Sequence, residues 1–189
     1  MAKDITRITS TLADIAADVR AEFGGLTPAQ LNWKPGADSW SVAQCLDHLI
    51  KTNTEMLPAI NKKIAGARNS LWEQWSPLTG FFGGFLSKAM PKDDKKYKAP
   101  SKTIVPPSNI DADVVERFEA NQAIVIEKIK ALSDMDWERS VITSPFMGLM
   151  TYRISDGVVI LVEHEKRHVR QAKRVMQAPA FPASEIAAV

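Results

Sequence analysis

The apolar residues of this chain recur every three or four positions along four long stretches, the spacing that places them on one face of an α-helix. The stretches run from Asp4 to Phe23, from Ser41 to about Gly66, from Asn109 or Asp111 to Leu132, and from Thr151 or Ser155 to just before Pro179. No segment has the alternating pattern of a convincing strand. Helices that are apolar on one face bury that face against other helices. The sequence therefore predicts an all-α fold, a four-helix bundle with long inter-helix connections.

Residues that favour helix ends flank these stretches. Ser41 and Gln44 have the spacing of a capping box, so the second long helix is expected to begin directly after Ser41. Thr27 followed by Pro28 predicts a further short helical turn between the first two long helices. Within the second stretch, Pro58 removes one backbone donor, which predicts a kink rather than an end.

The periodicity fails between residues 71 and 107, where aromatic residues mingle with glycines and prolines. The aromatics are Trp72, Trp75, Phe81, Phe82 and Phe85. A structureless connection of this length is unusual in a compact domain, so we expect some helix within it. We expect its aromatics to pack over one end of the bundle, either as plain packing or as a wall or lid. We assign residues 1–178 to one bundle domain and residues 179–189 to a C-terminal tail.

The composition limits the classes of partner. The chain has 189 residues, 45% of them hydrophobic, which suffices for the core of one globular domain. The net charge is only +2, so the charge of the chain gives no indication of a nucleic-acid partner. The densest basic run, residues 92–98, contains two aspartates and is interpreted as a solvated loop. No stretch resembles a secretory signal or could cross a bilayer, so we expect a cytoplasmic protein without a membrane partner.

Histidine is rare in this chain, and its three copies fall in a compact pattern. His164 and His168 are four residues apart in the last helix, so their imidazoles lie on one face about one turn apart. His48 lies at the border of the apolar stripe of the second long helix. Two interpretations are open at this point: a metal site made by three imidazoles, or surface and core histidines that bind nothing. The scarcity and placement of His48, His164 and His168 make them candidate metal ligands.

Glu165 lies at the centre of the apolar stripe of the last helix, where a carboxylate is costly unless it is paired. It could hydrogen-bond a ligating imidazole, act as a fourth ligand, or pair with an arginine from another helix, such as Arg7 or Arg20. It is therefore the candidate catalytic residue, with a structural pairing as the alternative. Gln171, three residues beyond His168, could also orient an imidazole, although a solvated side chain is the simpler interpretation.

Cys45 is the single cysteine, which excludes an intramolecular disulfide. It is three residues from His48 and could reach the same metal ion, but it also belongs to the apolar stripe of its helix. We interpret it as a core residue rather than as a nucleophile or a metal ligand.

Two segments of the sequence resemble those of a known family. Residues 40–49, WSVAQCLDHL, resemble the tryptophan–serine start of the histidine-bearing second helix in the DinB-like superfamily. Residues 164–171, HEKRHVRQ, resemble its final histidine pair, and residues 145–148 look like the preceding connection. The resemblance implies the fold of the DinB/YfiT-type metal-binding four-helix bundles. It also implies a nickel or zinc ion held by His48, His164 and His168, often in a dimeric protein.

The resemblance implies less about activity. Relatives include thiol-dependent transferases or isomerases that use bacillithiol, mycothiol or glutathione, and others described as metal-dependent hydrolases. The aromatic stretch from Trp72 to Phe85 departs from the compact core of that family, so no single relative's substrate is transferred to this chain.

Three imidazole ligands leave an open coordination position, where a metal-bound water or thiol becomes a nucleophile near neutral pH. Two functions therefore stay open. One is a metal-dependent thiol transferase or hydrolase that acts on a small molecule, with a low-molecular-weight thiol as cosubstrate. The other is a noncatalytic binding or stress-response module that the metal stabilises.

Overall fold

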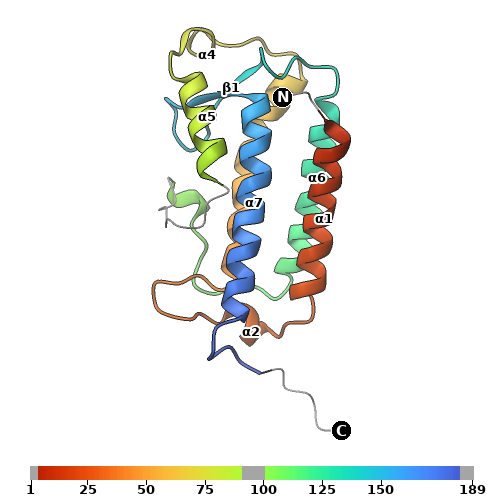
Figure 1. Ribbon diagram of the computed structural model, residues 1–189, viewed down its shortest axis with the longest axis vertical. Coiled ribbons are helices and arrows are strands. Elements are labelled where there is room, and N and C mark those ends of the chain that lie inside the picture. The colour runs from red at the N-terminus through yellow and green to blue at the C-terminus, as the bar shows by residue number, and fades with distance from the viewer. Residues whose placement is uncertain (1–3, 91–100, 184–189) are drawn as a thin grey trace.

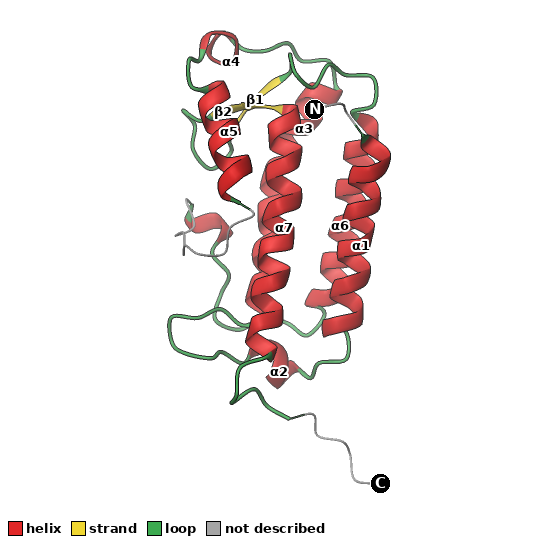
Figure 2. Cartoon of the chain, in the orientation of Figure 1, coloured by secondary structure: helices red, strands yellow, loops and turns green. Residues whose placement is uncertain are grey.

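Four long helices lie side by side within residues 4–90 and 101–183, which the computed structural model describes (Figures 1 and 2). They are α1 (Ile5–Phe23), α3 (Val42–Ile64), α6 (Val114–Ala131) and α7 (Ile154–Met176). Each coincides with one of the four periodic stretches of the sequence. The predicted all-α four-helix bundle is therefore confirmed.

Each long helix packs against two of the others. Both α1 and α3 contact α6 and α7, which places α1 and α3 diagonally across the bundle. In Figure 1, α1 and α7 run downward, whereas α3 leads from α2 (Pro28–Asn32) at the bottom to α4 (Leu71–Trp75) at the top. Because α6 also runs upward, the chain has to return to the bottom between residues 65 and 113. This return explains the long second connection.

The first three helices begin at the residues that the sequence indicates. Asp4 caps α1 by accepting a bond from the Arg7 amide at 2.8 Å. The reciprocal capping box of Ser41 and Gln44 precedes α3, and α3 continues through Pro58. Local side-chain capping therefore sets these boundaries.

The start of α6 differs from the prediction. Its N-cap is Asp113, whose side chain makes no capping bond. In the preceding loop, the backbone of Ile110 exchanges two hydrogen bonds of 2.9 Å with the side chain of Asn32, and the first helical amide donates to the Asp111 carbonyl in a turn. The expectation that Asn109 or Asp111 caps this helix is wrong, because α2 and this turn hold the loop instead.

A short antiparallel hairpin precedes α7, although the sequence predicts no strand. β1 (Val141–Thr143) pairs with β2 (Thr151–Arg153), with Ile142 opposite Tyr152. Thr151 therefore lies in a strand, and Ser155 is the second residue of α7, so neither starts the helix as predicted. Three residues are too few for a recognisable alternation.

The segment 71–90 forms what we call the aromatic arm, which contains α4 and α5 (Thr79–Ala89). α5 packs against α7 and β2 and lies beside the upper half of α7 in Figures 1 and 2. After the arm, the described part of the connection contains the 3-10 helix η1 (Lys102–Ile104). The connection thus contains some helix, as predicted.

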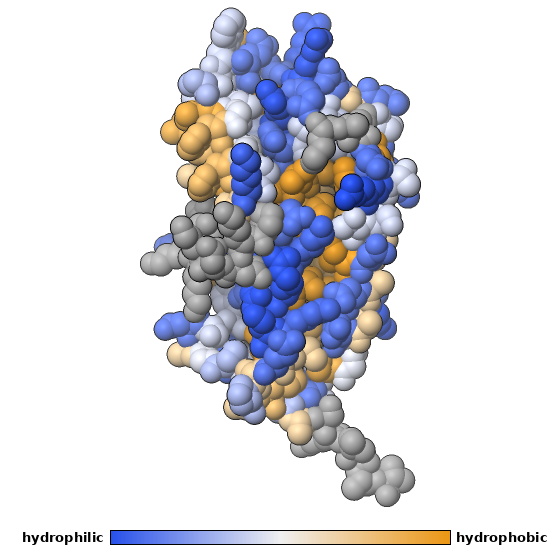
Figure 3. All heavy atoms as spheres, in the orientation of Figure 1, coloured by the Kyte–Doolittle hydropathy of each residue, from blue (hydrophilic) through white to orange (hydrophobic). Residues whose placement is uncertain are grey.

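Buried polar contacts attach the aromatic arm to the bundle. The Lys63 ammonium lies 2.9 Å from the Glu73 carboxylate, and the two side chains are 5% and 12% exposed. The hydroxyls of Thr79 and Thr151 lie 2.8 Å apart. The outer side of the arm is apolar, since Trp75 is 76% exposed, and Figure 3 shows hydrophobic residues gathered over α5.

A layer of polar side chains divides the bundle core into two apolar clusters. The lower cluster joins the end of α1 and of α7 to the start of α3 and of α6, and the upper cluster joins the opposite halves of these helices. The layer consists of Asn53 on α3, Asn121 and Gln122 on α6, and Glu165 on α7, all buried. Every long helix except α1 contributes a side chain to it.

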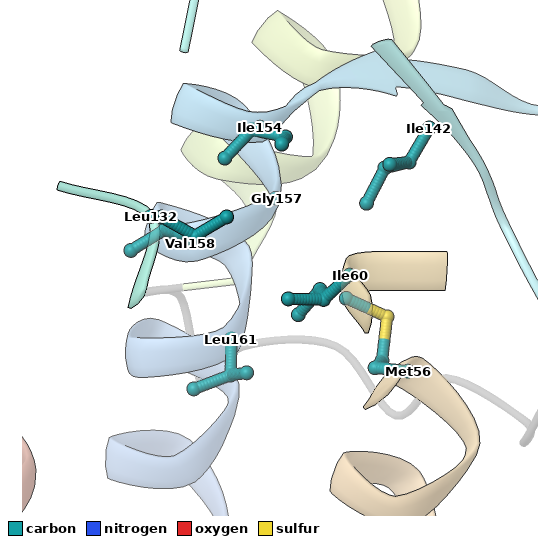
Figure 4. A pocket seen from close by; sticks show the side chains of 8 residues that line it. All are labelled: Met56, Ile60, Leu132, Ile142, Ile154, Gly157, Val158 and Leu161. Atoms are coloured by element: carbon teal, nitrogen blue, oxygen red, sulfur yellow. The ribbon is translucent and has the colours of Figure 1, made fainter. Parts of the chain in front are cut away.

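The upper cluster is closed by the hairpin. A cavity of about 10 Å³ lies there. Figure 4 shows the residues that line it, which are Met56, Ile60, Leu132, Ile142, Ile154, Gly157, Val158 and Leu161. It holds at most one water-sized sphere, so it is a packing defect rather than a ligand site. A Cβ at Gly157 would lie 3.0 Å from the Tyr152 ring, so glycine allows this tyrosine to pack onto α7.

The C-terminal residues after α7 contact the bottom of the bundle. Phe181 packs edge-on against Trp33 with ring centroids 5.6 Å apart, and Gln30 donates to the Pro182 carbonyl at 3.0 Å. Residues 184–189 and the basic run 92–98 lie outside the described residues, so the division at residue 178 stays a prediction. Among the helices described, none is both long and apolar enough to cross a lipid bilayer.

Candidate metal centre

The structure brings the three histidines together. His48 on α3 faces His164 and His168 on the neighbouring α7, and the ring centroids lie 4.6–5.1 Å apart. One ring nitrogen from each histidine can be chosen so that all three nitrogens lie within 4.8 Å of one another. Residues 116 positions apart in the sequence thus converge on one point.

The hydrogen bonds of His48 fix its tautomer. Its Nδ1 lies 2.8 Å from the carbonyl oxygen of Ile104 in η1. Because a carbonyl oxygen can only accept, Nδ1 carries the proton, and Nε2 of the neutral ring keeps its lone pair. That Nε2 lies 3.2 Å from Nε2 of His164. A backbone contact of this kind is the usual way in which a metal-binding imidazole is oriented.

The environment also keeps the imidazoles of His48 and His164 neutral. Burial lowers the pKa of His48, although the bond to Ile104 and the charge of Asp47 oppose this shift. Burial, the two other histidines and Arg167 hold the pKa of His164 well below its ordinary range. Both rings are therefore uncharged at neutral pH, which is the form that binds a metal ion.

One of the distances between the imidazole nitrogens fits a single first-row ion, and the three nitrogens together lie within 4.8 Å of one another. Two nitrogens that bind the same ion at about 2.1 Å lie roughly 3.0–3.4 Å apart in octahedral or tetrahedral geometry. The 3.2 Å between the Nε2 atoms of His48 and His164 falls in that range. The indole ring of Trp40 packs against His48 and His168, with ring centroids 4.8 and 5.6 Å apart. The site therefore has both the donor set and a rigid apolar support.

Glu165 lies on the inner face of α7 and is fully buried. One carboxylate oxygen accepts a bond from Asn53 at 2.8 Å, and the other accepts from Gln122 at 2.7 Å. Arg20 instead pairs with Glu116 and Glu119. The alternative in which an arginine such as Arg7 or Arg20 pairs with Glu165 is therefore wrong, because two amides supply the hydrogen bonds.

Burial raises the pKa of Glu165 to about 7, and the bonds from Asn53 and Gln122 oppose this shift. The cluster of groups able to share an ion consists, among the described residues, of the three histidines without this carboxylate. The catalytic role predicted for Glu165 stays a prediction.

Cys45 points into the lower apolar cluster and is fully buried. Burial raises the pKa of its thiol to about 12, and the charge of Arg174 opposes only part of that shift. A protonated thiol inside an apolar core does not bind metal or act as a nucleophile. The interpretation of Cys45 as a core residue fits this environment.

The histidines line a large cavity between the bundle and the aromatic arm. Its volume is about 910 Å³, at the upper end of the range for small-molecule sites. Its walls come from α3, α5, α7, the hairpin loop and the segment around η1. Gln171, for which no bond to an imidazole is found, also lines it. α5 thus forms one wall of the cavity, which agrees with the alternative of a wall. The expectation that the aromatics pack over one end of the bundle is wrong, because Trp75, Phe81 and Phe85 are 76%, 63% and 53% exposed.

The sequence of the chain can be compared with known protein families. The sequence profile of the DinB superfamily matches residues 11–172. The chain belongs to the DinB superfamily. The matched range includes His48, His164 and His168 together with the whole aromatic arm.

A bacterial relative extends this comparison. This chain and the "Uncharacterized protein YuaE" of Bacillus subtilis strain 168 are 27% identical over 157 residues. The aligned region covers 82% of this chain and 89% of the relative. No solved structure gives a significant match. The relative's name assigns no activity, so the function of this DinB-superfamily protein has to be argued from its site.

Several groups around the site of this DinB-superfamily protein were not predicted from the sequence. Ile104 orients His48 from the aperiodic connection, where the sequence carries no signal. Asn53 and Gln122 do leave a signal, because both are polar residues at positions of the apolar stripes of their helices. Polar residues at such positions indicate a buried network, and here they locate the partners of Glu165.

Proposed function

We propose that this protein is a metal-dependent enzyme in which His48, His164 and His168 hold a nickel or zinc ion beside a small-molecule site. The observation that carries the proposal is the position of the three imidazoles on the wall of a cavity of about 910 Å³. Catalytic zinc sites have three protein ligands and an open position, whereas structural sites are closed by four ligands. Superfamily membership supports the same assignment.

The residues of the chain prepare this site in distinct ways. Ile104 holds His48 in the tautomer that leaves Nε2 available, and Trp40 covers the imidazoles on one side. The ion, when bound, would lower the pKa of a coordinated thiol or water and make it a nucleophile near neutral pH. The surrounding apolar walls would exclude bulk water from the reacting molecules. The proposed reaction is transfer of a low-molecular-weight thiol to a small molecule, or hydrolysis of that molecule.

Glu165 is proposed as a positioning residue. Its carboxylate bonds to Asn53, which itself lines the cavity, and Glu165 directly follows the ligand His164 on α7. It can therefore fix the rotation of α7 and the orientation of Asn53 without touching a substrate. An effect of Glu165 on the metal site would then act through Asn53 and through the orientation of α7, which carries His164.

Metal analysis tests the premise. Wild-type protein, His164→Ala and Gln171→Ala would be produced in medium that contains nickel and zinc, and purified without a metal-affinity step. Wild-type protein and Gln171→Ala should hold about one ion per chain, and His164→Ala should hold almost none. Gln171 is the matched control because it lines the same cavity on the same helix. Equal metal contents in wild-type protein and His164→Ala would contradict the proposal.

Activity is tested on the metal-loaded protein. It would be incubated with glutathione, bacillithiol or mycothiol together with alkylating and aryl electrophiles, and separately with esters and amides without thiol. Metal-dependent loss of thiol indicates transfer, and metal-dependent cleavage without thiol indicates hydrolysis. If neither occurs and thiols leave the spectrum of the cobalt-substituted protein unchanged, the metal instead stabilises a noncatalytic module by joining α3 to α7.

A further inference from the structure

The cavity extends along α7 on both sides of the histidines. On this helix its lining begins at Ile160 and Leu161 and ends at Arg174 and Val175. Arg174 lies 13 positions after Leu161 and each position rises about 1.5 Å, so the cavity spans about 20 Å along the helix. His164 and His168 lie between these ends. A metal ion at the histidines would thus divide the cavity into two halves.

The two halves differ in chemistry. The half towards the hairpin, here called the apolar half, is lined by Met56, Phe85, Leu86, Phe146, Met147, Met150, Tyr152, Ile160 and Leu161. The half towards the end of α7 is lined by Asp38, Ser39, Gln171 and Arg174. The charged residues that line the described part of the cavity are Asp38, Arg167 and Arg174, and Arg167 lies beside the histidines rather than in the apolar half. A charged group buried there would lose its hydration without an ionic partner.

Methionine is unusually frequent around the apolar half. Met56, Met147 and Met150 line it, and Met90 lies at the end of α5 on the same wall. Methionine side chains are unbranched and flexible, so they adapt to apolar groups of different shapes. Such a wall suits an apolar group of variable structure rather than one fixed ligand.

The apolar half opens to solvent beside the aromatic arm. Phe85 on α5 is 53% exposed and Met147 in the hairpin loop is 47% exposed, and both line the cavity. The wall of the apolar half therefore reaches the protein surface at these two residues. The outer apolar side of the arm lies next to this opening, so apolar molecules would be held near it.

We infer that the molecule that reacts beside the histidines carries an uncharged apolar group, such as an alkyl chain or an aromatic ring, which occupies the apolar half of the cavity. Its reactive end then faces His164, and the polar half remains for a hydrophilic cosubstrate. The inference rests on the proposed function for the reaction. The binding of the apolar group depends only on the cavity.

The test measures binding rather than turnover. A neutral naphthylamine dye, fluorescent in apolar surroundings, would be bound to metal-free and zinc-loaded protein and displaced by primary alcohols from butanol to octanol. Each added methylene should strengthen the competition about fourfold until the apolar half is filled. Competition that does not depend on chain length would overturn the inference.

Two matched pairs of variants locate the dye. Met147→Asp and Phe85→Ser change residues of the cavity wall, whereas Leu149→Asp and Phe81→Ser change exposed neighbours that do not line it. The first two should weaken dye binding at least tenfold, and the controls less than twofold. All four positions are substantially exposed, so folding should be retained and is checked by circular dichroism. Equal losses in all four would place the dye on the outer surface of the arm and refute the inference.

The measurements on metal-free protein separate the two proposals. Loss of metal binding in wild-type protein would defeat the proposed function, while the chain-length dependence in metal-free protein would still report the apolar half. Conversely, a stoichiometric metal ion together with absent alcohol competition would leave the metal centre in place and remove the apolar substrate class.

Discussion

The two walls of the large cavity are built in different ways. The histidine wall consists of α3 and α7, two helices of 23 residues each, and it is backed by the bundle core. The opposite wall is α5, a helix of 11 residues with its outer rings in solvent. The first wall can be altered only together with the fold, whereas the second can change shape or composition without disturbing the bundle. A metal site of fixed geometry is thereby combined with a substrate wall that can vary.

The contacts of the arm support this distinction. A Cβ added at Gly83 would collide with the carboxylate of Asp156 and lie 2.9 Å from its Cβ, so α5 and the first turn of α7 approach closely at this one point. Nearer its start, the arm is held by the pair of Lys63 and Glu73, by bonds from Thr143 to Glu73, and by contacts of Ser76 and Thr79 with Thr151. Because the attachment depends on few residues, each of the two walls can be perturbed separately.

The largest effect is expected within the histidine wall. Glu165→Ala removes the acceptor for two buried amides and leaves space in the centre of the bundle. Unsatisfied donors and a cavity should lower the free energy of unfolding by about 2–4 kcal/mol, measured by urea denaturation. Gln171→Ala, on the same helix but facing the cavity, should change it by less than about 0.5 kcal/mol. An unchanged stability of Glu165→Ala would mean that the polar layer does not support this wall.

A smaller effect is expected for the contact between the arm and α7. Gly83→Ala should lower stability by about 1–3 kcal/mol, since neither Asp156 nor the helix backbone can move freely. Gly84→Ala is the matched control, because its Cβ meets no atom within 4 Å and alanine favours a helix. Metal content should be the same in both variants. A loss of metal in Gly83→Ala would break the separation of the two walls.

The histidine wall is also the part of the molecule that the sequence predicts best. The repeated spacing of apolar residues predicts the long amphipathic helices, and local caps such as Ser41 with Gln44 predict where these helices begin. The spacing of His164 and His168 follows from the helix, and their pairing with His48 became a candidate because the chain has no other histidine. These features depend on residues that are close in sequence or on helices that pack as a unit.

The arm wall could not be placed from the sequence. Its position depends on contacts between distant residues, such as Lys63 with Glu73 and Gly83 with Asp156, which leave no periodic signal. The three-residue strands of the hairpin are too short to show alternation. The Ile104 carbonyl is a backbone group, so no side-chain pattern can reveal its bond to His48.

The Lys63–Glu73 pair predicts a pH dependence confined to the arm. Burial raises the pKa of Glu73, but the bonds from Lys63, Ser70 and Thr143 outweigh it and hold the pKa below its ordinary value of 4.5. The stabilisation is therefore fully present above pH 4.5 and is lost as the pH falls through the lower pKa of the folded protein.

Glu73→Gln measures this contribution. At pH 7 it should lower the free energy of unfolding by about 1–2 kcal/mol, because the ionic acceptor of a buried ammonium is lost. As the pH falls below 4.5, the difference from wild-type protein should shrink, since the wild-type carboxylate becomes protonated. Glu127→Gln, in an exposed pair with Lys128, serves as the control. A difference that stays constant with pH would show that the charge of Glu73 does not attach the arm.

The smallest expected effect concerns Cys45 in the histidine wall. Its thiol is fully buried and its pKa is raised to about 12, so the native protein should not react with a disulfide reagent at pH 8. Unfolding in urea should release one thiol per chain. His48 is one turn away on the same helix. A reactive cysteine would therefore mean that this part of α3 is rotated so that Cys45 faces the cavity. Cys45→Ala should likewise leave metal content unchanged, because imidazoles and not the thiol face the cavity.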